Sequence, residues 1–209
     1  MSSPLTTPEP TFHFGGYLDD KPGPDGVGFW PRAGARIIDT ILHTLVGIVA
    51  GLAFGIMLGI ATALTGSDPA PLIQKAGTSP ILAFLAGITG HVAYHTICEG
   101  LHGSTLGKML LGQVVLTDDL QPCGPRSALI RSLAYYVDTL FFGAVGYLVM
   151  NKTRQMKRHG DNWADTFVTR RAEVSPDQLR STGRFVAVLV LAMAMDAAIA
   201  MTALVAMIV

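Results

Sequence analysis

The stretch RAGARIIDTILHTLVG, from Arg32 to Gly47, opens a long apolar run, yet it places an aspartate and a histidine, Asp39 and His43, inside the first turns. Half of the 209 residues are hydrophobic, 14% are charged, and the mean hydropathy is +0.43. Soluble domains carry about 25% charged residues, so this composition indicates an integral membrane protein. The formal net charge is zero, which gives no indication of a nucleic-acid partner.

Four apolar stretches approach the length of roughly 20 residues that a helix needs to cross a bilayer. Ile37–Leu64, Ser79–Cys98 and Phe185–Val209 are nearly free of charge, whereas Leu129–Met150 is interrupted by an arginine, an aspartate and two glycines. Residues 108–124 carry β-branched side chains and a turn-like Thr-Asp-Asp, which predicts a small interfacial strand or hairpin.

The distribution of Lys and Arg orients these elements, because loops on the cytoplasmic side retain positive charge. Three basic residues lie before the first span, one follows that span, three lie in 99–131 and eight in 151–184. If Leu129–Met150 enters the membrane and returns, 14 of the 15 basic residues lie on one side. We therefore predict an all-α membrane protein with three spanning helices and a re-entrant or interfacial helical hairpin that bends near Gly143 and Gly146. Four spanning helices are the alternative.

A nine-residue motif occurs twice, as RAGARIIDT from Arg32 and as RSLAYYVDT from Arg131. Each copy places an aspartate, Asp39 or Asp138, seven residues after the arginine, which puts both side chains on one helical face about two turns apart. An aspartate near hydrocarbon costs roughly 2.5–3.5 kcal/mol unless it is paired or hydrated. We therefore expect both acids to face inward between helices, either as ion-handling groups or as structural pairs that lock helix packing.

Three segments resemble the RDD family of small bacterial membrane proteins, which is named for an arginine and two aspartates. They are RAGARIIDT in the first span, GSTLGKMLLGQVV from Gly103, and GDNWADTFV from Gly160. The resemblance covers residues 28–171, and the Gly-x-Thr-Leu-Gly-Lys block is its most specific part.

This resemblance implies a set of site residues. Arg32 corresponds to the arginine of the family and Asp39 to its first acid, while the second acid is either Asp138 or Asp161. The chain departs from the family pattern at Asp165, where a glycine is more usual, and in its apolar C-terminal helix. The role of the family is largely unassigned, with ion or proton exchange as the leading proposal.

The resemblance and the apolar stretches together divide the chain into three parts. Residues 1–28, rich in Pro and Gly, are expected to form an irregular soluble arm, because they lack the basic start and apolar core of a signal peptide. Residues 29–171 are expected to form the membrane domain, and residues 172–209 a linker followed by the C-terminal transmembrane helix.

The second span carries a histidine face. In HVAYHTICEGLH, His91, His95, Cys98 and His102 follow one another at i, i+4, i+7 and i+11, within a narrow arc that Glu99 borders. Imidazole and thiolate are ligands of zinc and copper, and histidines beside a carboxylate also relay protons. Because i and i+11 lie about 16 Å apart along the axis, a metal site would need a neighbouring pair and a residue of the first span. The sequence predicts no other cofactor.

The first span offers a matching polar face, because Asp39 and His43 are spaced i, i+4. If the two faces pack together, a polar column would run from these residues through His91 and His95 to Glu99. A further acid, central to the last span, is expected to face protein or water, since hydrocarbon disfavours its charge.

Two main functions follow, and the sequence leaves both open. The first is a small ion or proton-coupled transporter, oligomeric because so few helices must enclose a pathway. Its candidate pathway residues are Arg32, Asp39, His43, His91, His95, Glu99, Arg131, Asp138 and Asp161. The second is a non-catalytic membrane adaptor or assembly factor, and a third is a metal-binding membrane protein.

No enzyme motif is readable, so we expect no catalytic activity. The expected location is the bacterial cytoplasmic membrane, with the basic loops and the arm on the cytoplasmic side. The expected partners are the lipid bilayer, a small cation or proton, and further copies of the chain.

Overall fold

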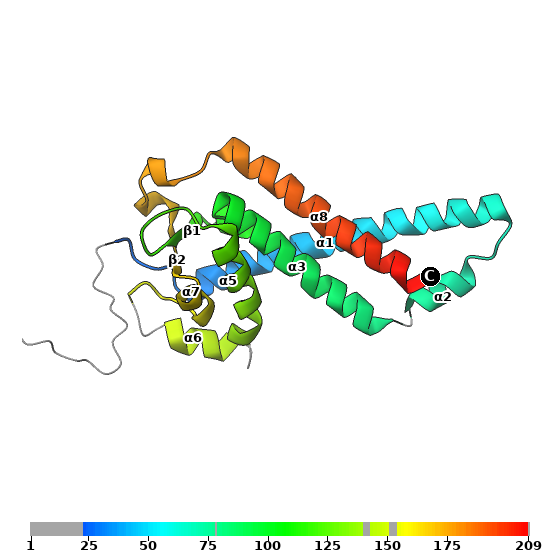
Figure 1. The fold of residues 1–209 in the computed structure, drawn as a ribbon, viewed down its shortest axis with the longest axis horizontal. Helices are drawn as coiled ribbons and strands as arrows, with labels where there is room; N and C mark the ends of the chain where they lie inside the picture. Colours follow the sequence, from blue (N-terminus) through cyan, green and yellow to red (C-terminus); the bar gives the residue numbers. More distant parts are fainter. Residues whose placement is uncertain (1–22, 78, 140–142, 151–153, 209) are drawn as a thin grey trace, which may run out of the picture.

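Three long helices run the length of the molecule (Figure 1). They are α1 (Phe29–Thr65), α3 (Pro80–His102) and α8 (Thr182–Ile208), and each lies in a segment long and apolar enough to cross a membrane. The three predicted spans are thereby confirmed. The computed structural model describes the chain in four ranges, which are residues 23–77, 79–139, 143–150 and 154–208.

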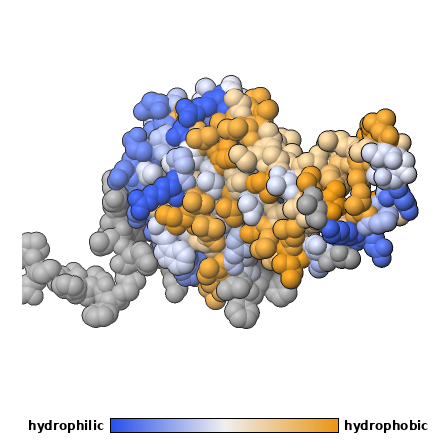
Figure 2. Space-filling model, turned by 45° about the vertical axis from the view of Figure 1, so that its right-hand side comes forward, coloured by the Kyte–Doolittle hydropathy of each residue, from blue (hydrophilic) through white to orange (hydrophobic). Residues whose placement is uncertain are grey.

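The outer surfaces of the three helices are apolar. Large side chains such as Ile56 of α1, Phe84 of α3 and Val190 of α8 are more than half exposed. Figure 2 shows this hydrophobic surface over the middle of the molecule, with hydrophilic surface at both ends. The 37 residues of α1 give a length of about 55 Å, more than the roughly 30 Å of a hydrocarbon core. The apolar middle of the molecule is therefore the part that suits lipid.

The core of the bundle lies between α3 and α8. Tyr94 and Cys98 of α3 are buried against Val188 and Ala192 of α8. Ala192 is fully buried, and such a small side chain lets two helices approach closely without a hydrophobic driving force from water. α1 crosses the pair and also packs against α8.

The predicted helical hairpin is present at one end of the bundle. It consists of α5 (Pro125–Asp138) and α6 (Ala144–Met150), which both lie at the end where α1 begins (Figure 1). The 14 residues of α5 measure about 21 Å, too short for a crossing. Gly143, between the helices, has a φ of +85°, a left-handed conformation that glycine adopts without steric cost. This arrangement confirms the hairpin over the four-span alternative.

A two-stranded antiparallel sheet lies at the same end. It pairs β1 (Gln113–Thr117) with β2 (Thr166–Arg170). The strand predicted within residues 108–124 is thereby confirmed, but its principal partner is a strand about 50 residues later and not the adjacent segment. The local return of the chain contributes one bridge, between Leu116 and Pro122. Four residues of each strand are buried, because Val115 and Val168 belong to one apolar cluster of this end and Leu116 and Phe167 to another.

Short elements complete this polar end. They are α4 (Leu106–Leu110), α7 (His159–Trp163) and the 3₁₀ turns Arg171–Glu173 and Pro176–Gln178. We call the whole region the head, and define it as residues 103–181 together with the chain from Gly23 to Arg36, within the described ranges.

At the opposite end, α2 (Ala70–Gly77) joins α1 to α3. Lys75, on α2, is the one basic residue of the described ranges that lies away from the head and from the first turn of α8. The arm predicted over residues 1–28 falls mostly outside the described residues, so the three-part division of the chain stays a prediction.

Candidate functional site

Asp39 lies on α1 where the helix leaves the head, and its carboxylate is fully buried. Oδ1 accepts hydrogen bonds from the Tyr94 hydroxyl (3.0 Å) and the Gly107 backbone N–H (2.8 Å), and Oδ2 accepts one from the Thr105 hydroxyl (2.7 Å). A Cβ on Gly107 would overlap the backbone carbonyl of Ala35, so glycine is what lets α4 lie this close to α1. The Gly-Ser-Thr-Leu-Gly-Lys segment therefore folds around Asp39 and holds it with uncharged donors.

Five charged side chains of alternating sign form a second cluster, which we call the charge network: Arg32, Asp161, Arg131, Glu99 and Lys108. Asp161 accepts hydrogen bonds from Arg32 Nη1 (2.5 Å) and from Arg131 Nη1. Glu99 accepts one from Arg131 Nε (3.0 Å) and one from Lys108 Nζ. Each of the five is less than one-tenth exposed. Because buried charges are costly unless they are paired and hydrogen-bonded, the network fixes α1, α3, α4, α5 and α7 relative to one another.

The network controls the protonation of its members in the head. Burial raises the pKa of Asp161, but the guanidinium groups of Arg131 and Arg32 outweigh this effect and hold that pKa well below its ordinary value. Burial likewise lowers the pKa of Arg131, and the carboxylates of Asp161 and Glu99 reverse the effect and raise it. Burial lowers the pKa of Lys108 to about 8, against the attraction of Glu99. Asp161 and Arg131 therefore stay charged, whereas Lys108 loses its proton more readily than an exposed lysine does.

The two copies of the Arg-x₆-Asp motif meet at Asp161. Arg32 and Arg131 bind opposite oxygens of its carboxylate. Within the described contacts, neither arginine binds the aspartate of its own motif. Asp39 is held by uncharged donors, and Asp138 lies 3.1 Å from Nδ1 of its partner on α7, a histidine. Both arginines are therefore held by tertiary contacts with Asp161.

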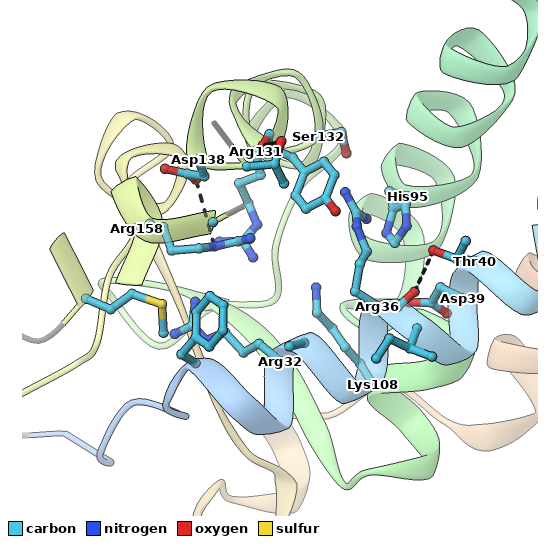
Figure 3. Close-up of a pocket in the computed structure, with 18 of the residues that line it drawn as sticks. Arg32, Arg36, Asp39, Thr40, His95, Lys108, Arg131, Ser132, Asp138 and Arg158 are labelled. Atoms are coloured by element: carbon cyan, nitrogen blue, oxygen red, sulfur yellow. Dashed lines mark hydrogen bonds and ion pairs between the residues drawn. The ribbon is translucent and has the colours of Figure 1, made fainter. Parts of the chain in front are cut away.

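A cavity of about 400 Å³ opens beside the charge network, bounded by α1, α3, α4, α5 and α6. Figure 3 shows Arg36 and Arg158 reaching towards it from opposite sides, and Lys108 pointing into the space between them. Arg36 lies over the ring of Tyr135, with Cζ 3.5 Å from the ring centroid, a cation–π arrangement. The cavity wall also includes the exposed Ile37 of α1, so the site lies where the head meets the apolar part of the helix.

A row of titratable side chains connects the middle of the bundle to this cavity, and we call it the histidine row. His43 Nδ1 lies 2.7 Å from Asp196 Oδ2 on α8. The ring centroids of His43 and His91 are 5.6 Å apart, and those of His91 and His95 are 4.6 Å apart. His95 Nδ1 then lies 3.8 Å from Glu99 Oε1. The structure thus brings together the residues of the predicted polar column, with Asp196 in the place expected for Asp39.

Close helix contact makes room for the acid at the inner end of the row. A Cβ on Gly90 of α3 would overlap the carboxylate of Asp196 and would approach His43 to 3.2 Å. At the outer end, both ring nitrogens of His95 lack a hydrogen-bond partner among the described residues. The row is therefore hydrogen-bonded at Asp196 and lacks a hydrogen bond to its imidazole at the other end, within the described residues.

The metal site considered at His91, His95, Cys98 and His102 does not form. Cys98 is buried in the apolar core against α8, and the ring of His102 packs against that of Phe185 at a centroid distance of 4.9 Å. Within the described part of the chain, no group of three or more His, Cys, Asp or Glu side chains is placed to hold a metal ion. The four side chains share a helical face, but they have different neighbours. His91 and His95 belong to the histidine row, whereas Cys98 and His102 pack against side chains of α8.

Sequence reasoning did not assign three cations of the cavity. Arg36 lies one turn after Arg32, a spacing that puts both on one helical face. Lys108 belongs to the Gly-x-Thr-Leu-Gly-Lys block. Arg158 belongs to a cluster of basic residues that the orientation of the protein in the membrane is enough to explain. The helical spacing of Arg36 and the motif position of Lys108 are the signals that could have found them.

Comparison with known proteins identifies one family. The model of the RDD family matches residues 27–165. The match contains both copies of the Arg-x₆-Asp motif, the segment around Asp39 and both acids of the charge network, Glu99 and Asp161. No curated protein and no solved structure matches the chain.

Proposed function

The chain belongs to the RDD family, and we propose that it is a proton-coupled ion transporter in which protons move along the histidine row. The observation that carries the proposal is the continuity of the row, from Asp196 in the middle of α8 to Glu99 at the cavity. Imidazole is the side chain whose unperturbed pKa lies near neutrality, and a neutral ring has one donor and one acceptor nitrogen. Neighbouring rings can therefore pass a proton by exchanging these roles when a rotation brings their nitrogens within hydrogen-bond distance or a water bridges them.

The proton suits this site better than a metal cation does. Ionisable groups inside a membrane protein are costly and are candidates for substrate or ion pathways. The cavity, however, is lined by more cationic than anionic side chains, and Coulomb repulsion disfavours a second cation there. The same repulsion acts on a proton, but a proton needs no set of coordinating ligands and adds to a single imidazole nitrogen, such as one of His95, which borders the cavity.

The proposal includes a homo-oligomer and an orientation. Beyond His43 in α1, before Gly90 in α3 and after Asp196 in α8, the spans contain no charged residue or histidine. A proton pathway through the other half of the bilayer therefore needs water, either enclosed between copies of the chain or admitted by another conformation. We place the basic head on the cytoplasmic side of the bacterial inner membrane, following the positive-inside rule, and assign no catalytic activity.

Proton flux in proteoliposomes tests the proposal. His95→Gln should reduce proton flux at least tenfold, because glutamine cannot carry the proton. His102→Gln is the matched control, since both histidines lie on α3, both are almost fully buried and both lack hydrogen-bond partners among the described residues. Of these two histidines, only His95 belongs to the histidine row. Native protein that carries no flux under Na⁺, K⁺ or pH gradients, or an equal loss in both variants, would refute the proposal.

The second candidate, a membrane adaptor or assembly factor, is favoured by the environment of Asp39. Both oxygens of its carboxylate are occupied by protein donors, which leaves little capacity to bind an ion. A buried acid held in this way stabilises the contact between α1 and α4 and needs no transport role.

A further inference from the structure

Arg36 is a cation of the cavity for which the described residues supply no carboxylate. Its guanidinium lies over the ring of Tyr135, and its Nε is buried without a hydrogen-bond acceptor within the described ranges. Stacking on an aromatic ring engages the face of a guanidinium and leaves its N–H edge for a planar or tetrahedral oxyanion. A side chain in this state is prepared to bind an anion.

Two more guanidinium groups of the same cavity have donors to spare. Nη2 of Arg131 and Nε of Arg158 are buried and have no acceptor among the described residues. Arg131 is 2% exposed, and Nε of Arg158 lies 3.9 Å from the carboxylates of Asp138 and Asp161, beyond hydrogen-bond distance. Buried donors are normally satisfied, so unsatisfied ones call for an explanation such as a ligand or ion.

The charges around the cavity also favour an anion. Its cationic wall residues come from α1, α4, α5 and the segment before α7, and they are Arg32, Arg36, Lys108, Arg131 and Arg158. Its anionic wall residues are Asp39, Glu99 and Asp138. Asp161 behind the wall binds two of the cations, which still leaves the cations in excess by one. Arg36 is the cation that has no carboxylate partner among the described residues.

We propose that this cavity binds a phosphate group through Arg36, Arg131 and Arg158, with Lys108 as an additional positive charge. Guanidinium groups recognise phosphate oxygens by paired, charge-assisted hydrogen bonds. Donors that approach from three different elements suit the tetrahedral oxygens of phosphate better than the flat edge of a carboxylate. The volume of about 400 Å³ lies within the range of small-molecule sites.

The phosphate has two possible sources. Inorganic phosphate can enter from the water around the head. A phospholipid headgroup can enter from the bilayer, because the exposed Ile37 and Thr40 of α1 form part of the cavity wall and the lipid-facing stretch of α1 begins immediately after them. The proposal goes beyond the transport function and does not require it, since binding needs no gradient.

Ligand titrations of the purified protein in an uncharged detergent test this assignment. One series adds sodium phosphate, with sodium chloride at equal ionic strength as its reference. The other adds phosphatidylglycerol, with diacylglycerol as its reference. Thermal unfolding, followed by tryptophan fluorescence, reports binding as a saturable rise in the midpoint. If the free ion is the ligand, we expect the midpoint of the native protein to rise with sodium phosphate. If the lipid is the ligand, we expect it to rise with phosphatidylglycerol alone.

Substitution of Arg36 provides the decisive comparison. Arg36→Gln should weaken the apparent affinity at least tenfold, which is the usual effect of losing a charge-assisted hydrogen bond, and Arg36→Lys should restore part of it. Arg126→Gln is the control, because Arg126 is exposed on α5 and lies outside the cavity. Equal responses to each ligand and its reference, or native affinity in Arg36→Gln, would overturn the proposal. Phosphate binding without proton flux would remove only the transport function.

Discussion

Replacing Asp161 by asparagine removes one negative charge from the centre of the charge network. Its carboxylate is fully buried and accepts hydrogen bonds from Arg32, Arg131 and the backbone N–H of Arg158. Asparagine has nearly the same shape, but it leaves the buried Arg32 without a counter-charge among the described residues and leaves Arg131 with Glu99 alone. Breaking a buried ion pair in this way costs about 3–5 kcal/mol, so Asp161→Asn should lower the free energy of unfolding of the head by that amount.

Tryptophan fluorescence during denaturation in mixed micelles measures this loss. The chain has two tryptophans, Trp30 and Trp163, and both lie at the head, so their signal follows its unfolding. Asp25→Asn is the matched control, because Asp25 forms an exposed ion pair with Arg154 at 2.7 Å, and exposed pairs contribute about 0–1 kcal/mol. If Asp161→Asn costs no more than Asp25→Asn, the charge network does not hold the head together.

Acid provides an independent check on the same carboxylate. The pKa of Asp161 is lowered in the folded state, so the unfolded chain binds a proton more readily. The stabilisation is therefore complete above the unfolded pKa, about 3.9, and is lost as the pH falls through the folded pKa. The difference in stability between the native protein and Asp161→Asn should shrink below about pH 4.

Two further substitutions test the segment around Asp39. Gly107→Ala should cost about 1–3 kcal/mol, because its Cβ would overlap the Ala35 carbonyl, whereas Gly47→Ala meets nothing within 4 Å and should leave the unfolding midpoint unchanged or slightly higher. Asp39→Asn replaces an acceptor oxygen by an amide donor and should reduce the yield of folded protein, measured by gel filtration, more than Asp25→Asn does. A well-folded Asp39→Asn that has lost proton flux would instead make Asp39 an ion-binding group.

The sequence by itself determined the membrane architecture. A span depends on local composition, because hydrocarbon selects any run of about 20 apolar residues whatever its neighbours are. Counting basic residues distinguished the hairpin over Leu129–Met150 from a fourth span, and Gly143 marked its bend. The histidine face of α3 was also readable, since i, i+4 spacing fixes which side chains share a face. These features depend on residues near one another in the chain.

Only the tertiary structure decided which charges meet. Arg32 and Asp161 are 129 residues apart, and any acid on a facing element would satisfy the same guanidinium equally well. The motif placed Arg32 and Asp39 on one helical face but did not identify the partner of Arg32, which is Asp161 in the structure. A buried charge needs a counter-charge, but which residue supplies it depends on how the helices pack. The cavity beside Arg36 is likewise a product of that packing.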